Sequence, residues 1–72
     1  MAAASYHKGT WRADVGAEEL ASGKYQGIVL LIREGKPQHD QIEHRTIDLL
    51  DTPEEAVEEA SVLAQHLLGT LH

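Results

Sequence analysis

Histidine side chains are the groups in this sequence best suited to proton transfer or metal binding near neutral pH. The chain of 72 residues has five of them: His7, His39, His44, His66 and His72. A metal site needs three or four converging donors, whereas these histidines are predicted to lie on a strand, a loop, another strand, the outer side of a helix and a tail. We therefore expect exposed histidines and no metal site. His44 is set apart, because a strand position between Glu43 and Arg45 could face a subunit interface.

Other reactive residue types also lack the setting that catalysis requires. The chain has no cysteine, which excludes disulfides, thiolate zinc sites and a cysteine nucleophile. Ser5, Ser22 and Ser61 stand outside any nucleophile-elbow pattern, and the glycines form no phosphate-binding loop between a strand and a helix. The neighbouring carboxylates Asp40 and Glu43 are expected to be solvated in a turn. We predict a noncatalytic protein, not an enzyme, with no cofactor.

Charge argues against nucleic acid as a partner. The net charge is −6 and the isoelectric point about 5.1, whereas nonspecific nucleic-acid binding depends on clustered Lys and Arg. Trp11, Tyr6 and Tyr25 could stack on bases, but no pattern of cations is interleaved with them. We expect Trp11 to lie in the core.

Three segments have the alternation or the β-branched content of strands. Residues 7–15 alternate apolar and polar side chains, with Trp11 on the inner side. Residues 25–33 form the strongest strand. In the third strand, residues 42–50, the apolar positions change parity, which predicts a bulge or a change of twist near Thr46.

Residues 51–68 contain a helix whose start is well specified. Thr52 is placed as the N-cap, Pro53 as the first helical residue and Glu55 as the capping-box partner. Gly69 ends the helix. Apolar residues recur at helical spacing and predict one core-facing side: Ala56, Val57, Ala60, Leu63, Ala64, Leu67 and Leu68.

The order of these segments predicts an α+β fold. Because the connections are short, we expect a three-stranded antiparallel β-meander with one C-terminal amphipathic helix packed on one face (β-β-β-α). Residues 17–22, between the first two strands, are long enough for a loop or one helical turn. The predicted domain spans residues 6–69, with a flexible N-terminus at residues 1–5 and a short tail at residues 70–72.

The central strand is apolar on both sides, although one helix can cover only one side. Val29 and Leu31 share one side, and the other side carries Ile28, Leu30 and Ile32. Either side could meet the helix, and the helix-free side is a candidate interface. The candidate interface residues are therefore Val29, Leu31, Leu30 and His44. We expect a homodimer joined through the helix-free face, or binding to another protein.

Four glutamates gather in the first turns of the predicted helix: Glu54, Glu55, Glu58 and Glu59. Such a run is usually a solvated face that complements the positive end of the helix dipole. It is also a candidate acidic docking face for a basic partner. The longest apolar run, residues 28–32, is too short to span a bilayer. We expect a soluble, cytoplasmic protein that does not bind membranes.

The junction from the last strand into the helix resembles that of HicB-like antitoxin domains. The matching residues are Asp51, Thr52, Pro53, Glu54, Glu55 and Ala56, followed by Val57, Glu58, Glu59 and Ala60. In that family a small sheet-and-helix domain, similar to a reduced double-stranded-RNA-binding fold, binds and blocks a ribonuclease toxin. The resemblance implies a similar architecture and a protein partner. The family's proline- and glycine-rich loop and its DNA-binding tail have no counterpart, so no functional residues are carried over.

Two functions therefore compete. The first is a small noncatalytic protein-interaction domain that acts by self-association or partner binding through an open sheet face. The alternative is an antitoxin-like inhibitor of a basic ribonuclease toxin, docking through the acidic helix face. The first predicts apolar contacts that tolerate salt, and the second a salt-sensitive complex.

Overall fold

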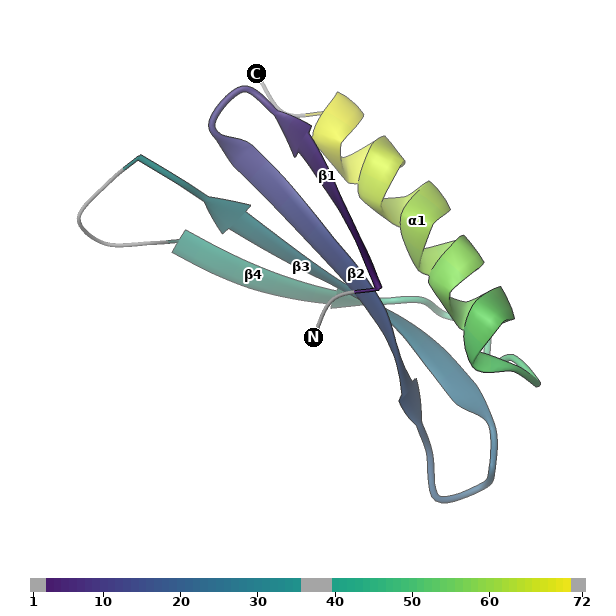
Figure 1. Cartoon of the computed structure of the whole chain (residues 1–72). Coiled ribbons are helices and arrows are strands. Elements are labelled where there is room, and N and C mark those ends of the chain that lie inside the picture. Colours follow the sequence, from purple (N-terminus) through teal and green to yellow (C-terminus); the bar gives the residue numbers. More distant parts are fainter. Residues whose placement is uncertain (1–2, 36–39, 71–72) are drawn as a thin grey trace.

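The protein is an antiparallel sheet with one helix lying obliquely across a single face (Figure 1). The computed structural model describes residues 3–35 and 40–70. Along the chain the elements are β1 (Ala4–Lys8), β2 (Trp11–Glu19), β3 (Tyr25–Arg33), β4 (Asp40–Arg45) and α1 (Pro53–Gly69). The four strands follow each other in the sheet in the order β1-β2-β3-β4. The predicted α+β meander with a C-terminal helix is confirmed, but the predicted number of three strands is wrong.

The additional strand arises because the predicted first strand, residues 7–15, contains a chain reversal. Lys8 pairs with Trp11, so Gly9 and Thr10 are the two turn residues of a hairpin. Gly9 has a φ of 59°, as the first central residue of a type II′ turn requires. After the turn, Trp11, Ala13 and Val15 face the core, as the alternation predicts. The ordered domain begins earlier than predicted, because β1 starts at Ala4 and not at Tyr6. Ala4 is held there by its pairing with Val15 and its packing against the core.

A second hairpin joins β2 to β3. Residues 17–19 belong to β2, so the segment at residues 17–22 is the end of a strand and a turn, not a helical turn. The Leu20 N–H donates to the Lys24 carbonyl at 2.8 Å, and the Gly23 N–H donates to the Leu20 carbonyl at 2.9 Å. Gly23 has a φ of 86°, a backbone conformation that a glycine adopts without steric cost.

The predicted irregularity near Thr46 is present, but it is the end of β4 at Arg45 and not a bulge or twist within a strand that continues to residue 50. Regular pairing of β3 with β4 ends at Ile28 and Arg45, and the chain meets β3 again only in a single bridge between Tyr25 and Leu50. Residues 47–49 therefore loop outward before the helix begins. The sequence also predicts a turn at residues 34–37, of which residues 36–37 lie outside the described residues.

The predicted helix start and end are confirmed. The Thr52 hydroxyl accepts from the Glu55 N–H at 3.2 Å, and the same hydroxyl donates to the Glu55 carboxylate at 3.1 Å. Pro53 is the first helical residue, where its missing N–H costs no helical hydrogen bond. At the other end, Thr70 is the C-cap, and its hydroxyl donates to the Leu67 carbonyl at 2.7 Å.

The core lies between α1 and one face of the sheet. Its buried residues come from β2, β3 and α1: Ala13, Val15, Val29, Leu31, Ala60, Ala64 and Leu68. Trp11 packs against this cluster as predicted, as do the half-buried Leu63 and Leu67. The structure thus decides the question that the sequence left open, because the side of β3 with Val29 and Leu31 meets the helix.

The helix approaches the sheet most closely at Gly27. A Cβ atom at this position would lie 2.5 Å from the Ala56 carbonyl oxygen and 3.0 Å from the Ala60 Cβ. Ala56, Ala60 and Ala64 recur every fourth residue and are all fully buried. Small side chains on both elements therefore let the helix backbone lie almost directly on β3.

We predict that Gly27→Ala destabilises the fold by about 1–3 kcal/mol, the usual cost of overpacking. The added Cβ would meet the Ala56 carbonyl oxygen, and a backbone atom cannot move aside as a flexible side chain can. Chemical denaturation measures the change. Gly16→Ala is the matched control, because no atom lies within 4 Å of a Cβ built at this neighbouring strand position. It should leave the stability unchanged or raise it by about 0.5–1 kcal/mol. Equal effects of the two substitutions would contradict the close approach.

The helix cap gives a second prediction. Thr52→Ala removes the hydroxyl that accepts from the Glu55 N–H, and should lower the free energy of unfolding by about 0.5–2 kcal/mol. Thr52→Ser keeps the hydroxyl and should retain most of the stability. A denaturation midpoint for Thr52→Ala equal to that of the unsubstituted protein would show that the cap contributes nothing.

Candidate interaction surface

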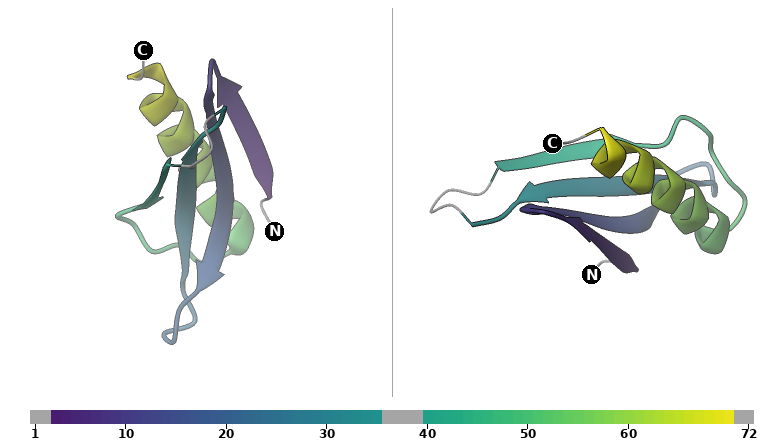
Figure 2. Two further views of the ribbon diagram at one scale, coloured as in Figure 1. Left: turned by 90° about the vertical axis from the view of Figure 1, so that its left-hand side faces the viewer. Right: turned by 90° about the horizontal axis from the view of Figure 1, so that it is seen from above.

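The helix leaves one strand of the sheet uncovered on the helix side. α1 packs against β2 and β3 and touches β1, because a helix about 10 Å wide spans only about two strands spaced about 4.8 Å apart. The consequence is visible in a pair of neighbours on the same face. Leu31 in β3 is 4% exposed, whereas its partner Ile42 in β4 is 48% exposed. Figure 2 shows β4 at the edge of the sheet away from β1.

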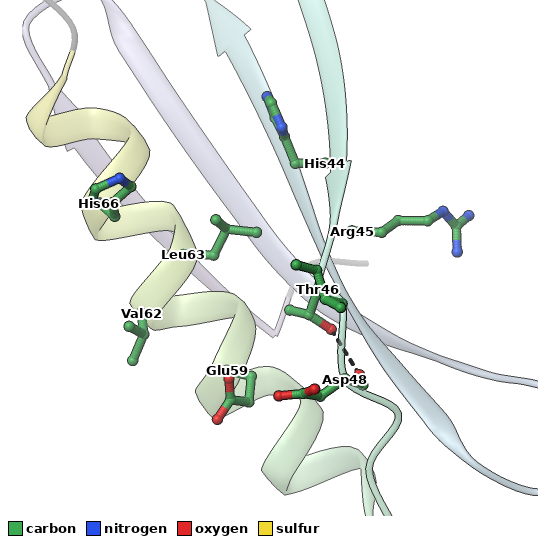
Figure 3. Close-up of a pocket in the computed structure, with 9 residues that line it drawn as sticks. His44, Arg45, Thr46, Asp48, Glu59, Val62, Leu63 and His66 are labelled. Atoms are coloured by element: carbon green, nitrogen blue, oxygen red, sulfur yellow. Dashed lines mark hydrogen bonds between the residues drawn. The ribbon is translucent and has the colours of Figure 1, made fainter.

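An open groove of about 470 Å³ lies between the end of β4 and α1 (Figure 3). One wall is formed by β4 and the segment after it: His44, Arg45, Thr46, Ile47 and Asp48. The other wall is one side of the helix: Glu59, Val62, Leu63 and His66. The groove is thus built from two segments that face each other across the uncovered strip of the sheet.

Large apolar side chains gather around this groove. Ile47 is 96% exposed and Val62 is 64% exposed, and both line it. Leu63 is half-buried and also lines the groove. Ile42 lies two residues before His44, so both side chains are on the same side of β4. We call Ile42, Ile47, Val62 and Leu63 the β4–α1 patch. Exposed apolar side chains that are grouped in this way are typical of an interaction surface.

Thr46 fixes the wall of the groove where β4 ends. Its buried hydroxyl accepts from the Gly27 N–H at 3.0 Å, while its own N–H donates to the Gly27 carbonyl at 2.9 Å. The Gln26 side-chain amide donates to the Thr46 carbonyl at 2.8 Å. The chain is therefore held to β3 at the point where the following residues loop outward, and Ile47 is exposed as a result.

Two carboxylates, Asp48 and Glu59, line the groove, whereas the Arg45 side chain points away from the helix (Figure 3). The Arg45 guanidinium donates to the Glu18 carboxylate, and this hydrogen bond raises the pKa of Arg45 above its ordinary value. Arg45 also lies 3.4 Å from the Glu43 carboxylate on its own strand. Both carboxylates are exposed, so these ion pairs orient side chains and contribute little to stability.

The helix-free face of the sheet is less open than predicted. Its apolar row on β3 consists of Ile28 and Leu30, which are half-buried, and Ile32, which is only 5% exposed. Ion-paired side chains flank the row on both neighbouring strands: Arg12 with Asp14 and Glu34, and Arg45 with Glu18 and Glu43. Long charged side chains cover apolar neighbours with their aliphatic stems, so little of this row reaches solvent.

The predicted interface residues separate into three groups. Val29 and Leu31 are core residues beneath the helix, with exposures of 0% and 4%, so neither can take part in an interface. Leu30 is half-buried on the helix-free face. His44 is half-buried and lines the groove.

The histidines of the described residues, His7, His44 and His66, do not form a site together. His44 and His66 lie on opposite walls of the groove, whereas His7 is exposed on β1. His39 and His72 lie outside the described residues. Within residues 3–35 and 40–70, no three His, Asp or Glu side chains are grouped so that they could hold a metal ion.

The predicted acidic face lies on the outer side of α1. Glu54, Glu55, Glu58 and Glu59 are all exposed. In the described part of the chain, the ion pairs involve other carboxylates: Asp14, Glu18, Glu34, Glu43 and Asp51. Glu59 also lines the groove, so the acidic face and the β4–α1 patch adjoin.

Sequence analysis missed Ile42, Ile47 and Val62 as surface residues. The sequence pattern could have indicated two of them, because Ile42 and Ile47 belong to residues 42–50, where the apolar positions change parity. We interpreted that irregularity as a bulge or a change of twist within one strand. Val62 lies next to Leu63 on the helix, and only the position of the helix over the sheet decides which of the two is exposed.

No family model matches the chain, and no curated protein or solved structure is similar enough to be matched with it. The resemblance to HicB-like antitoxin domains therefore rests on the strand-to-helix junction alone. No helix within the described residues combines the length and the apolar character that crossing a bilayer would need.

We predict that Thr46→Val destabilises the fold by about 1–3 kcal/mol, because a side chain of similar shape would leave the buried Gly27 N–H without its acceptor. Thr46→Ser keeps the hydroxyl and should be less harmful. Thermal or chemical denaturation compares the two variants. If Thr46→Val is the more stable of the two, the methyl contact matters more than the hydrogen bond.

Proposed function

We propose that this protein is a noncatalytic interaction domain that self-associates through the β4–α1 patch. The observation that carries the proposal is the exposure of Ile47 and Val62 in one groove beside the edge strand β4, together with the exposure of Ile42 on that strand. Burying an aliphatic side chain of this size contributes roughly 1.5–3 kcal/mol. A symmetric contact uses each of these side chains twice, once from each copy.

The patch is a better candidate interface than the helix-free face, where sequence analysis placed it. Ile32 is already buried there, and the charged side chains beside Leu30 would lose their hydration in a contact. The apolar side chains of the patch are more exposed, and the carboxylates of Asp48 and Glu59 lie beside them. An apolar centre with a polar rim is the usual anatomy of a protein interface.

A second candidate function is docking of a basic protein on the acidic helix face, as in an antitoxin-like inhibitor. The four exposed glutamates and the net charge of −6 favour this partner chemistry. Such a complex would weaken strongly with added salt, because its charges are exposed and screened. A self-association of apolar side chains would tolerate salt.

Sedimentation equilibrium of the purified protein tests the proposal. We expect a dimer, or a homomer built from dimers, that dissociates when Ile47→Lys and Val62→Lys are combined. Both side chains are largely exposed in the single chain, so the fold should survive, as circular dichroism would show. Ser22→Lys with Gln65→Lys is the matched control, because it adds the same charge at other exposed positions and should leave association unchanged.

Two results would contradict the proposal. A wild type that is monomeric at high micromolar concentration would exclude self-association. Dissociation by Leu30→Lys in a folded protein, together with an unaffected Ile47→Lys/Val62→Lys variant, would move the interface to the helix-free face.

A further inference from the structure

β4 is an edge strand whose outer backbone groups face away from the sheet. Antiparallel strands alternate, so every second residue bonds to one neighbour and the residues between bond to the other. The Thr46 N–H donates to Gly27 in β3. By alternation, His44 and Ile42 also bond towards β3, and the N–H and carbonyl groups of Gln41, Glu43 and Arg45 point outward. This row of outward groups can pair with another strand.

The two edges of the sheet differ in what lies above them. At the β1 edge, Ala4 and Tyr6 pack against the core beneath the helix. At the β4 edge, Ile42 is 48% exposed because no helix lies above it. A strand added beside β4 would therefore gain backbone hydrogen bonds and cover apolar side chains at once.

We propose that this strand is β4 of a second copy, paired antiparallel about a two-fold axis at His44. In this register Glu43 lies opposite Arg45 of the second copy, and Arg45 lies opposite the second copy's Glu43. Cross-strand pairs of opposite charge favour a register, and like charges oppose one. An axis at Glu43 would place the two Glu43 side chains opposite each other, and an axis at Ile42 would place Gln41 opposite Glu43. Of these three axes, only the one at His44 places Glu43 opposite Arg45.

The arrangement follows from the symmetry. An axis perpendicular to the sheet keeps both helices on the same side, so two copies form an eight-stranded antiparallel sheet under two helices. The two β4–α1 patches then meet around the axis, with Ile42 of each copy beside the other copy's Thr46. The inference rests on the proposed self-association and specifies its partner and register.

Charge exchange tests the register. Glu43→Arg and Arg45→Glu each place like charges opposite one another twice, so each variant should raise the homodimer dissociation constant on the order of tenfold or more. Mixing the two variants should restore a dimer, because the arginines of one chain then face the glutamates of the other. The mixed dimer is also a control, because one of its chains lacks the ion pair between Arg45 and Glu18. If this dimer forms, the loss of that ion pair does not explain the dissociation of the Arg45→Glu homodimer.

A cysteine cross-link gives an independent readout, because the chain contains no cysteine. The two His44 residues would form a non-hydrogen-bonded pair, whose Cβ atoms lie about 4.5–5.5 Å apart, close to the distance that a disulfide spans. His44→Cys should therefore form a dimer-linking disulfide under mild oxidation. Ile42→Cys is the control and should cross-link much less.

The outcomes separate the register from the proposed function. A wild-type dimer that keeps its affinity in Glu43→Arg and Arg45→Glu, or that cross-links better through Ile42→Cys, overturns the inference but leaves self-association in place. A monomeric wild type overturns both. Recovery of the mixed dimer together with the His44→Cys cross-link supports the inference.

Discussion

The close contact between α1 and Gly27 is the constraint on which the rest of the structure depends. A glycine in β3 and a row of alanines on the helix allow the two backbones to approach until a single added carbon would meet the Ala56 carbonyl oxygen at 2.5 Å. The contact fixes the helix over β2 and β3.

The position of the helix explains the surface of the protein. A sheet of four strands is wider than one helix, so some apolar side chains on the helix side have to stay exposed. Here Ile42 is exposed on β4, and the exposed Ile47 and Val62 line the groove beside it. Thr46 adds to the exposure of Ile47, since its hydrogen bonds to Gly27 hold the chain to β3 at the point where residues 47–49 loop outward.

The two faces of the sheet handle exposed apolar surface differently. On the helix-free face, ion-paired side chains of β2 and β4 flank the aliphatic row of β3, and Ile32 is buried without a second layer of structure. On the helix side, β4 has no such cover above Ile42. A chain of this size gains much from burying that remaining surface, which is why self-association through β4 is consistent with the architecture.

The sequence by itself determined the elements that depend on near neighbours in the chain. The helix start at Thr52 and Pro53 and its end at Gly69 are set by capping within a few residues, and the strand character of β3 by its own side chains. Only the tertiary structure decided that Gly9 reverses the chain, that Val29 and Leu31 face the helix, and that Ile42 is uncovered. The last two features depend on which distant segments meet, and a two-sided apolar strand or an irregular one fits more than one such arrangement. The reversal at Gly9 is local, but the alternation of residues 7–15 also fits one continuous strand.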